Sequence, residues 1–155
     1  MSPAATPIKV SFSFYPSDMQ ALSARLVALR RAGLPVRGGT VLRALIHLTS
    51  PVEMFAHSVL LAGAYKQKDG PREDDNIAGH PTVDLPRDHV KKLDDVVTEL
   101  AAKGITSNRA FVVRAILRAS RDVPAFTTAV KKFLEDFPAR PRGRAALKAK
   151  QHGRL

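Results

Sequence analysis

The stretch Ser11-Phe12-Ser13-Phe14-Tyr15 recurs 71 positions later (82 − 11) as Thr82-Val83-Asp84-Leu85-Pro86. Both stretches are short, alternate polar with apolar residues and run directly into a helical pattern. The same frame continues without a gap and pairs apolar positions, a glycine and an arginine: Leu22 with Leu93, Leu29 with Leu100, Gly33 with Gly104, Val41 with Val112, Arg43 with Arg114 and Phe55 with Phe126. Self-similarity at a fixed spacing is typical of repeated structural units, so we interpret the chain as an internal duplication.

Each copy begins with a predicted strand that cannot be stable alone. In the first, Lys9–Tyr15, the side chains of Phe12 and Phe14 share one face and polar side chains occupy the other. A strand this short needs a pairing partner. The equivalent strand of the second copy, His80–Leu85, can supply it, either within one chain or between two chains.

Helical patterns follow each strand. The first ends at a glycine in both copies, Gly33 and Gly104, and we expect Ser17 and Asp88 to be its N-caps. A second and a third helix come next, and Ser50-Pro51-Val52-Glu53 carries the cap, first-turn proline and capping-box glutamate of a helix start. The predicted fold class is therefore mainly α with a short two-stranded antiparallel β-ribbon.

The third helix differs between the copies. Leu60 and Leu61 of the first align with Lys131 and Lys132 of the second, so the apolar surface nearly encircles the first copy's helix. Such a helix is usually buried. We hypothesise that it packs between the copies or forms a homo-oligomer interface.

These patterns divide the chain into five parts. We expect a flexible N-terminus (1–8), the first copy with its third helix (9–66, hereafter copy one), a polar linker (67–79), the second copy with its third helix (80–137, copy two) and a disordered basic tail (138–155). The tail contains no acidic residue, and if the chain binds nucleic acid we expect Arg140, Arg142, Arg144, Lys148 and Lys150 to contact its phosphates non-specifically.

The overall charge favours a polyanionic partner. The 155 residues include 25 Lys and Arg against 14 Asp and Glu, a formal net charge of +11. Nucleic acid is the first candidate for such a partner and an anionic membrane the second. The chain has no cysteine, which excludes disulfides and thiolate metal sites.

Other classes of protein find no support. The N-terminus lacks the pattern of a signal peptide, and no apolar run is long enough to span a bilayer, so we expect a cytoplasmic, nucleoid-associated protein without membrane contact. The five histidines fall at no metal-ligand spacing. No phosphate-binding loop, carboxylate pair or nucleophile with a base stands out. We therefore expect no enzyme, metal, cofactor or small-molecule substrate.

The strand, helix, glycine turn and helix of each copy resemble the ribbon-helix-helix family of DNA-binding proteins, the Arc and MetJ type. Copy two is more similar: Thr82-Val83-Asp84-Leu85-Pro86 resembles the family's strand, Lys103-Gly104-Ile105-Thr106-Ser107-Asn108-Arg109 its turn, and Val112-Val113-Arg114-Ala115-Ile116 its second helix. The resemblance covers residues 9–48 and 80–119, and each copy's third helix lies outside it. It implies a tandem ribbon-helix-helix protein that binds duplex DNA.

In that family, two antiparallel strands form a ribbon that enters the major groove with its outer face against the bases. The resemblance assigns this face to six residues: Lys9, Ser11, Ser13, His80, Thr82 and Asp84. Asp84 is the unusual member, because its carboxylate can accept from a cytosine amine but repels phosphate. It leaves open whether copy two reads bases or mainly completes the ribbon.

The family also anchors DNA phosphate at the start of its second helix, where free amides and the helix dipole favour an anion. The resemblance assigns this role to Thr106, Ser107 and Asn108 in copy two. In copy one the equivalent segment is Arg37, Gly38, Gly39 and Thr40, preceded by Val36 rather than a capping residue. The two half-sites should therefore be unequal.

Transcriptional repression is the function that we expect first. An accessory role in plasmid transfer or partition, or a nucleoid-associated role, is a second reading of the same DNA binding. A protein of another class, an antitoxin-like interaction module, is the third.

Overall fold

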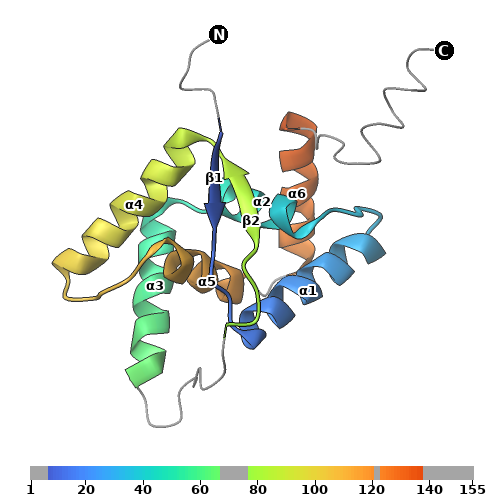
Figure 1. Cartoon of the computed structure of the whole chain (residues 1–155). Helices are drawn as coiled ribbons and strands as arrows, with labels where there is room; N and C mark the ends of the chain where they lie inside the picture. Colours follow the sequence, from blue (N-terminus) through green and yellow to red (C-terminus); the bar gives the residue numbers. More distant parts are fainter. Residues whose placement is uncertain (1–6, 67–76, 121–122, 138–155) are drawn as a thin grey trace.

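Two short strands pair across the centre of a mainly helical chain (Figure 1). The computed structural model describes residues 7–66, 77–120 and 123–137. In chain order the elements are β1 (Ile8–Ser11), α1 (Pro16–Arg31), α2 (Gly38–Leu48), α3 (Pro51–Lys66), β2 (Thr82–Leu85), α4 (Arg87–Ala102), α5 (Arg109–Ala119) and α6 (Val123–Asp136). The fold class, mainly helical with a two-stranded antiparallel sheet, is as the sequence predicts.

The strands of the two copies pair with each other within the one chain. β1 runs antiparallel to β2, and Ser11 is the partner of Thr82. These two residues are also counterparts in the 71-residue frame, so a local twofold relation between the copies passes through this pair. Beyond the end of β1, the amides of Phe12 and Phe14 donate to the carbonyls of Pro81 (3.0 Å) and Gly79 (2.9 Å), so the pairing continues along most of the predicted strand.

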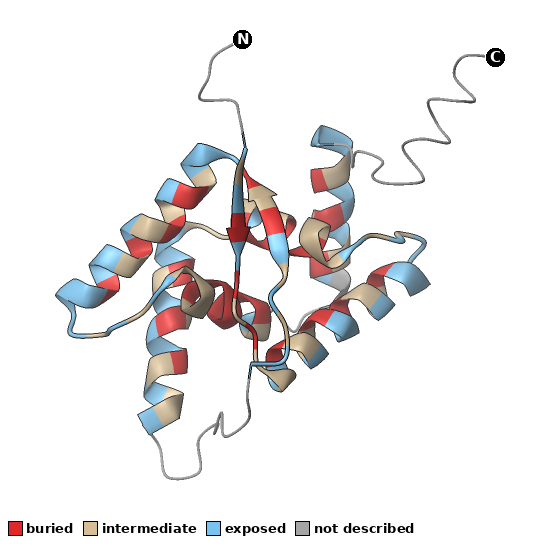
Figure 2. Ribbon diagram, viewed as in Figure 1, coloured by how far each residue is buried: buried red, intermediate tan, exposed pale blue. Residues whose placement is uncertain are grey.

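The inner face of the ribbon forms part of the core. Phe12, Phe14, Val83 and Leu85 are all buried, as their alternation predicts. Fully burying an aromatic or branched aliphatic side chain contributes about 1.5–3 kcal/mol. Buried positions gather where the helices face the ribbon and one another (Figure 2). The ribbon is therefore held from one side only and keeps its other face in solvent.

The helices of each copy pack against those of the other. α3 of copy one lies on α4 and α5 of copy two, and α6 of copy two lies on α1 and α2 of copy one. α1 also contacts α5. Each copy is too small to bury a sizeable core alone, and this exchange of surfaces gives both of them one shared core.

Both first-helix caps are placed wrongly by the sequence prediction. α1 begins at Pro16 with Tyr15 at the N-cap position, and α4 begins at Arg87 with Pro86 there, so Ser17 and Asp88 lie inside the first turn. Pro16 suits the first helical position because it has no N–H to satisfy. The capping carboxylate of α1 comes from within the helix: Asp18 accepts from the amide of Tyr15 at 2.9 Å.

Other helix ends agree with the sequence. Gly33 and Gly104 follow α1 and α4 with φ of 83° and 79°, the left-handed region that glycine enters without a steric penalty. Ser50 accepts from the amide of Glu53 at 3.2 Å, which confirms the start of α3.

The predicted all-round burial of α3 is only half right. Leu61 is 8 % exposed, whereas its neighbour Leu60 is 70 % exposed. The helix packs between the copies along one side, and its opposite side faces solvent. Among the described helices, no single one has the length and apolarity to cross a membrane; α2 and α3 pass that test only together, across a bend of 110°.

Candidate nucleic-acid interface

The ribbon places the six residues predicted for its outer face in three adjacent cross-strand pairs. Lys9 lies opposite Asp84 and Ser11 opposite Thr82 in the register of the strands. Ser13 lies near His80, with 3.4 Å between Ser13 Oγ and His80 Nδ1. All six side chains are exposed or half-buried. The structure thus gathers all six on one solvent-facing surface.

The side-chain hydroxyls of the central pair, Ser11 and Thr82, are hydrogen-bonded to each other and can still form further hydrogen bonds. Ser11 Oγ and Thr82 Oγ1 are 2.7 Å apart, and Thr82 Oγ1 also lies 3.3 Å from the carbonyl of His80. The backbone hydrogen bonds between the strands are made by the residues on either side, so Ser11 and Thr82 share none. Side chains at such positions stand closest to each other across a ribbon. Each hydroxyl offers one donor and two acceptor sites, so the pair can accept further bonds from a ligand.

The start of α5 lies beside β1. One shallow groove is lined by Ser11 and Ser13 of the ribbon together with Ser107 and Asn108 at the start of the helix. Asn108 caps α5 by accepting from the amide of Phe111 at 2.8 Å. The hydroxyl of Ser107 is buried and has no hydrogen-bond partner within the described residues, whereas Thr106 is exposed. Two groups of residues predicted separately therefore line the same groove.

An ion pair that the sequence analysis did not identify completes this groove. Arg109 Nε and Nη2 donate to the two carboxylate oxygens of Asp94 at 2.6 and 2.9 Å. The hydrogen bond from Arg109 lowers the pKa of Asp94, and the same bond raises the pKa of Arg109. The counterparts in copy one are Ser23 and Gly38, so copy one has no such ion pair. Comparing the two copies position by position would have revealed the difference.

The start of α2 lies beside β2. Arg37 is at the N-cap position without a side-chain capping bond, and Gly38, Gly39 and Thr40 form the first turn. A Cβ on Gly39 would lie 3.9 Å from the carbonyl oxygen of Thr82. A Cβ on Gly38 would lie 3.2 Å from Leu22, so packing on α1 already accounts for this glycine. The two helix starts therefore flank the ribbon from opposite sides and differ in their capping chemistry.

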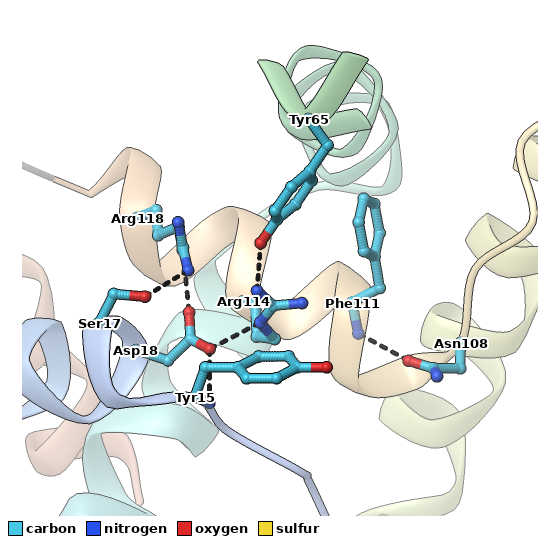
Figure 3. A network of polar contacts seen from close by, with 8 residues as sticks. All are labelled: Tyr15, Ser17, Asp18, Tyr65, Asn108, Phe111, Arg114 and Arg118. Atoms are coloured by element: carbon cyan, nitrogen blue, oxygen red, sulfur yellow. Dashed lines mark hydrogen bonds and ion pairs between the residues drawn. The ribbon is translucent and has the colours of Figure 1, made fainter. Parts of the chain in front are cut away.

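A buried charge network between the start of α1 and α5 links the two copies (Figure 3). Asp18 of α1 is fully buried and accepts from Arg114 Nε at 2.7 Å and Arg118 Nε at 2.8 Å, both from α5. Arg118 also donates to Ser17 Oγ at 2.7 Å, and Arg114 donates to the hydroxyl of Tyr65. Arg114 therefore has a structural role, and no sequence pattern marks Asp18 as its partner 96 residues away.

The other predicted residues can be placed only in part. The five tail residues expected to contact DNA, Arg140, Arg142, Arg144, Lys148 and Lys150, lie outside the described residues. Within the described ranges, no group of three or more His, Cys, Asp or Glu side chains could hold a metal ion.

Comparisons with protein-family models, curated proteins and solved structures gave no match to this chain. The functional argument therefore depends on the residues and their geometry.

Proposed function

We propose that this protein binds duplex DNA by inserting the β1–β2 ribbon into the major groove, as a tandem ribbon-helix-helix protein. The observation that carries the proposal is the exposed ribbon face with its three polar cross-strand pairs, flanked on each side by a helix start. A two-stranded ribbon is one of the few elements that the major groove admits. The +11 net charge supplies the long-range attraction to phosphate.

Each part of this surface has a distinct role in the proposal. The hydroxyls of Ser11, Ser13 and Thr82 bond base edges, and Lys9 bonds a base edge or a nearby phosphate. The starts of α2 and α5 face the phosphates on either side of the groove with free amides and the positive ends of the helix dipoles. Phosphate contacts hold the ribbon in place, and the hydroxyls provide sequence discrimination.

The two ends of the ribbon differ in charge. Lys9 and Asp84 form the pair at one end, whereas Ser13 and His80 form the pair at the other. The cap of α5 includes Asn108 and the neighbouring Arg109–Asp94 ion pair, and α2 has neither. A DNA site that fits this surface is therefore asymmetric, with two unequal half-sites.

The test is selection of bound duplexes from a random pool, followed by titration of the selected and a scrambled duplex at two salt concentrations. The double substitution Ser11→Ala, Ser13→Ala should lower discrimination between the duplexes about tenfold or more, since lost base contacts cost about 1–3 kcal/mol each. Affinity for both duplexes should fall steeply with salt because of counterion release. Thr98→Ala, Thr128→Ala, which removes two exposed hydroxyls from α4 and α6, is the matched control and should change neither quantity.

If the Ser11→Ala, Ser13→Ala variant lost affinity equally for both duplexes, base contact by the ribbon would be rejected. Binding that does not depend on salt would reject phosphate anchoring. The distribution of the bound protein across a replicon then identifies the biological role. Binding at one promoter fits a repressor, binding at one transfer or centromere-like site fits a plasmid accessory protein, and uniform binding fits a nucleoid protein.

A further inference from the structure

The side of α3 that faces solvent is apolar along its length. Val52 and Leu60 are 78 % and 70 % exposed, and Val59 is also exposed. Exposed positions recur along the whole helix (Figure 2). Between Glu53 and Lys66 the helix contains no Lys, Arg, Asp or Glu. A continuous exposed apolar surface of this kind is typical of an interaction site.

The residues of this face have the spacing of a coiled-coil seam. Four exposed positions follow one another at steps of four, three and four residues: Val52, Ala56, Val59 and Gly63, hereafter the α3 seam. Alternating steps of three and four keep side chains on one stripe of a helix, which a second helix can cover along its length. Leu60 lies beside this stripe and widens the apolar surface.

The equivalent helix of copy two lacks this surface. The 71-residue frame relates α3 to α6 and places Lys131 at the position of Leu60. Val130, the counterpart of the exposed Val59, is fully buried. The exposed seam is therefore a property of copy one, and the repeated fold does not require it.

Gly63 gives independent evidence for a close neighbour from outside the chain. A Cβ added to this residue would meet no atom within 4 Å among the described residues. Its φ is not positive, so the backbone conformation does not call for glycine. Glycine also destabilises a helix interior relative to alanine, because it loses more backbone freedom on folding. The fold of the described chain therefore gives no reason for this glycine, whereas a helix packed closely against α3 would.

We propose that two copies of this chain associate through the α3 seam, with α3 packed antiparallel against α3 of the partner. In the register that aligns the two seams, Val52 lies at the level of the partner's Gly63, and Ala56 at the level of the partner's Val59. Each layer then combines one valine with one small residue. The two helix backbones can approach closely without a clash, which accounts for Gly63.

Charge also favours the antiparallel arrangement. Each end of the pair would carry Glu53 from one chain and Lys66 from the other, and the two helix dipoles would oppose each other. A parallel pair would instead bring Glu53 to Glu53 and Lys66 to Lys66, and would set glycine against glycine. The face is thus complementary to itself in both size and charge, and this is the reason to assign it to a second copy of the chain.

The proposed interface is small. Four layers from one helix bury less than the roughly 1,200 Å² of a standard interface, so we expect a weak dimer with a Kd of about 1–100 μM. Each chain carries a net charge of +11, so added salt should strengthen the association by screening the repulsion between chains. The inference concerns association alone and does not depend on DNA binding.

Sedimentation velocity of the full chain, from about 1 to about 200 μM, covers this range of Kd. The unaltered chain should pass from monomer to dimer. Gly63→Leu should weaken the dimer at least roughly tenfold, because the added side chain would overpack the layer that holds the partner's Val52. Leucine is favourable in a helix and has open space in its own chain, so the variant should stay folded by circular dichroism. The matched control, Ala24→Leu, adds the same side chain at an exposed position of α1 and should leave the dimer unchanged.

Cross-linking tests the register, since the chain has no cysteine of its own. A mixture of the Val52→Cys chain and the Gly63→Cys chain should give a product that joins position 52 to position 63. Either variant alone should give little product, because two copies of the same residue would lie about 16 Å apart along the helix axis, at about 1.5 Å per residue. The thiol-specific cross-linker is chosen to be shorter than this separation. Peptide mass mapping identifies the joined positions.

Several outcomes would overturn the proposal. One is a chain that stays monomeric throughout the concentration range; binding of this monomer to anionic phospholipid vesicles would then assign the face to a membrane. Another is a Gly63→Leu variant that associates as strongly as the unaltered chain or more strongly, which would indicate unspecific adhesion of apolar surface. Cross-linking of each single variant to itself, without the mixed product, would reject the antiparallel register. Loss of DNA binding with the dimer intact would count against the proposed function and leave the association through α3 supported.

Discussion

Removing the charge of Asp18 tests the energetic importance of the contact between copies. Asp18→Asn keeps the size of the side chain and retains an oxygen that can accept from the amide of Tyr15. It removes the negative charge that Arg114 and Arg118 share at 2.7 and 2.8 Å. Asp18 is fully buried, and the side chains of the two arginines are 8 % and 20 % exposed. The substitution therefore leaves two largely desolvated cations without their carboxylate.

Breaking a buried ion pair by removing one partner costs about 3–5 kcal/mol. Arg114 is almost fully buried, whereas Arg118 is partly solvated. We therefore expect a cost at the lower end of this range, about 3 kcal/mol. With a urea dependence of about 2 kcal/mol per M, the unfolding midpoint should fall by about 1.5 M. Urea titration followed by circular dichroism measures both the midpoint and the slope.

The control is Asp95→Asn on α4. Asp95 pairs with Lys91 at 3.3 Å, but the side chains of Lys91 and Asp95 are 78 % and 63 % exposed. A solvent-exposed pair of this kind contributes only a few tenths of a kcal/mol. If the two substitutions cost the same, the network does not hold the copies together, and the reasoning from burial is wrong.

Two further predictions concern stability. Lowering the pH below about 6.5 should reduce the free energy of unfolding, because burial lowers the pKa of His89 below that ordinary value and the unfolded chain therefore takes up the proton first. The loss should end once the pH falls below the pKa of His89 in the folded protein. Urea titrations across this range should show a flatter profile for His89→Gln than for the unaltered chain; an equally steep profile in His89→Gln would assign the effect to another group. Phe14→Ala should cost about 3–5 kcal/mol in the same assay, since the ring is fully buried, whereas Val27→Ala at a 41 % exposed position should cost about 0.5 kcal/mol or less. Equal costs would show that the ribbon is not part of the core.

The sequence alone determined the elements and the faces of the ribbon. Alternation in residues 9–15 separates Phe12 and Phe14 from Ser11 and Ser13 because successive side chains of a strand point to opposite faces. Gly33 and Gly104 mark helix ends because a left-handed residue is needed there. These properties depend on the nearest few residues, so local patterns are enough to predict them. The duplication also showed which segments of the two copies are equivalent.

Only the tertiary structure decided which surfaces meet. Asp18 looks like an ordinary first-turn acid in the sequence, and its partners Arg114 and Arg118 come from the other copy. Leu60 and Leu61 look alike in the sequence, yet only Leu61 lies on the side of α3 that packs against copy two. The pairing of β1 with β2 within one chain is likewise a feature that only the tertiary structure decided. Each depends on how two separate segments approach in space, and a repeat frame shows that two surfaces are equivalent without showing which of them will pack together.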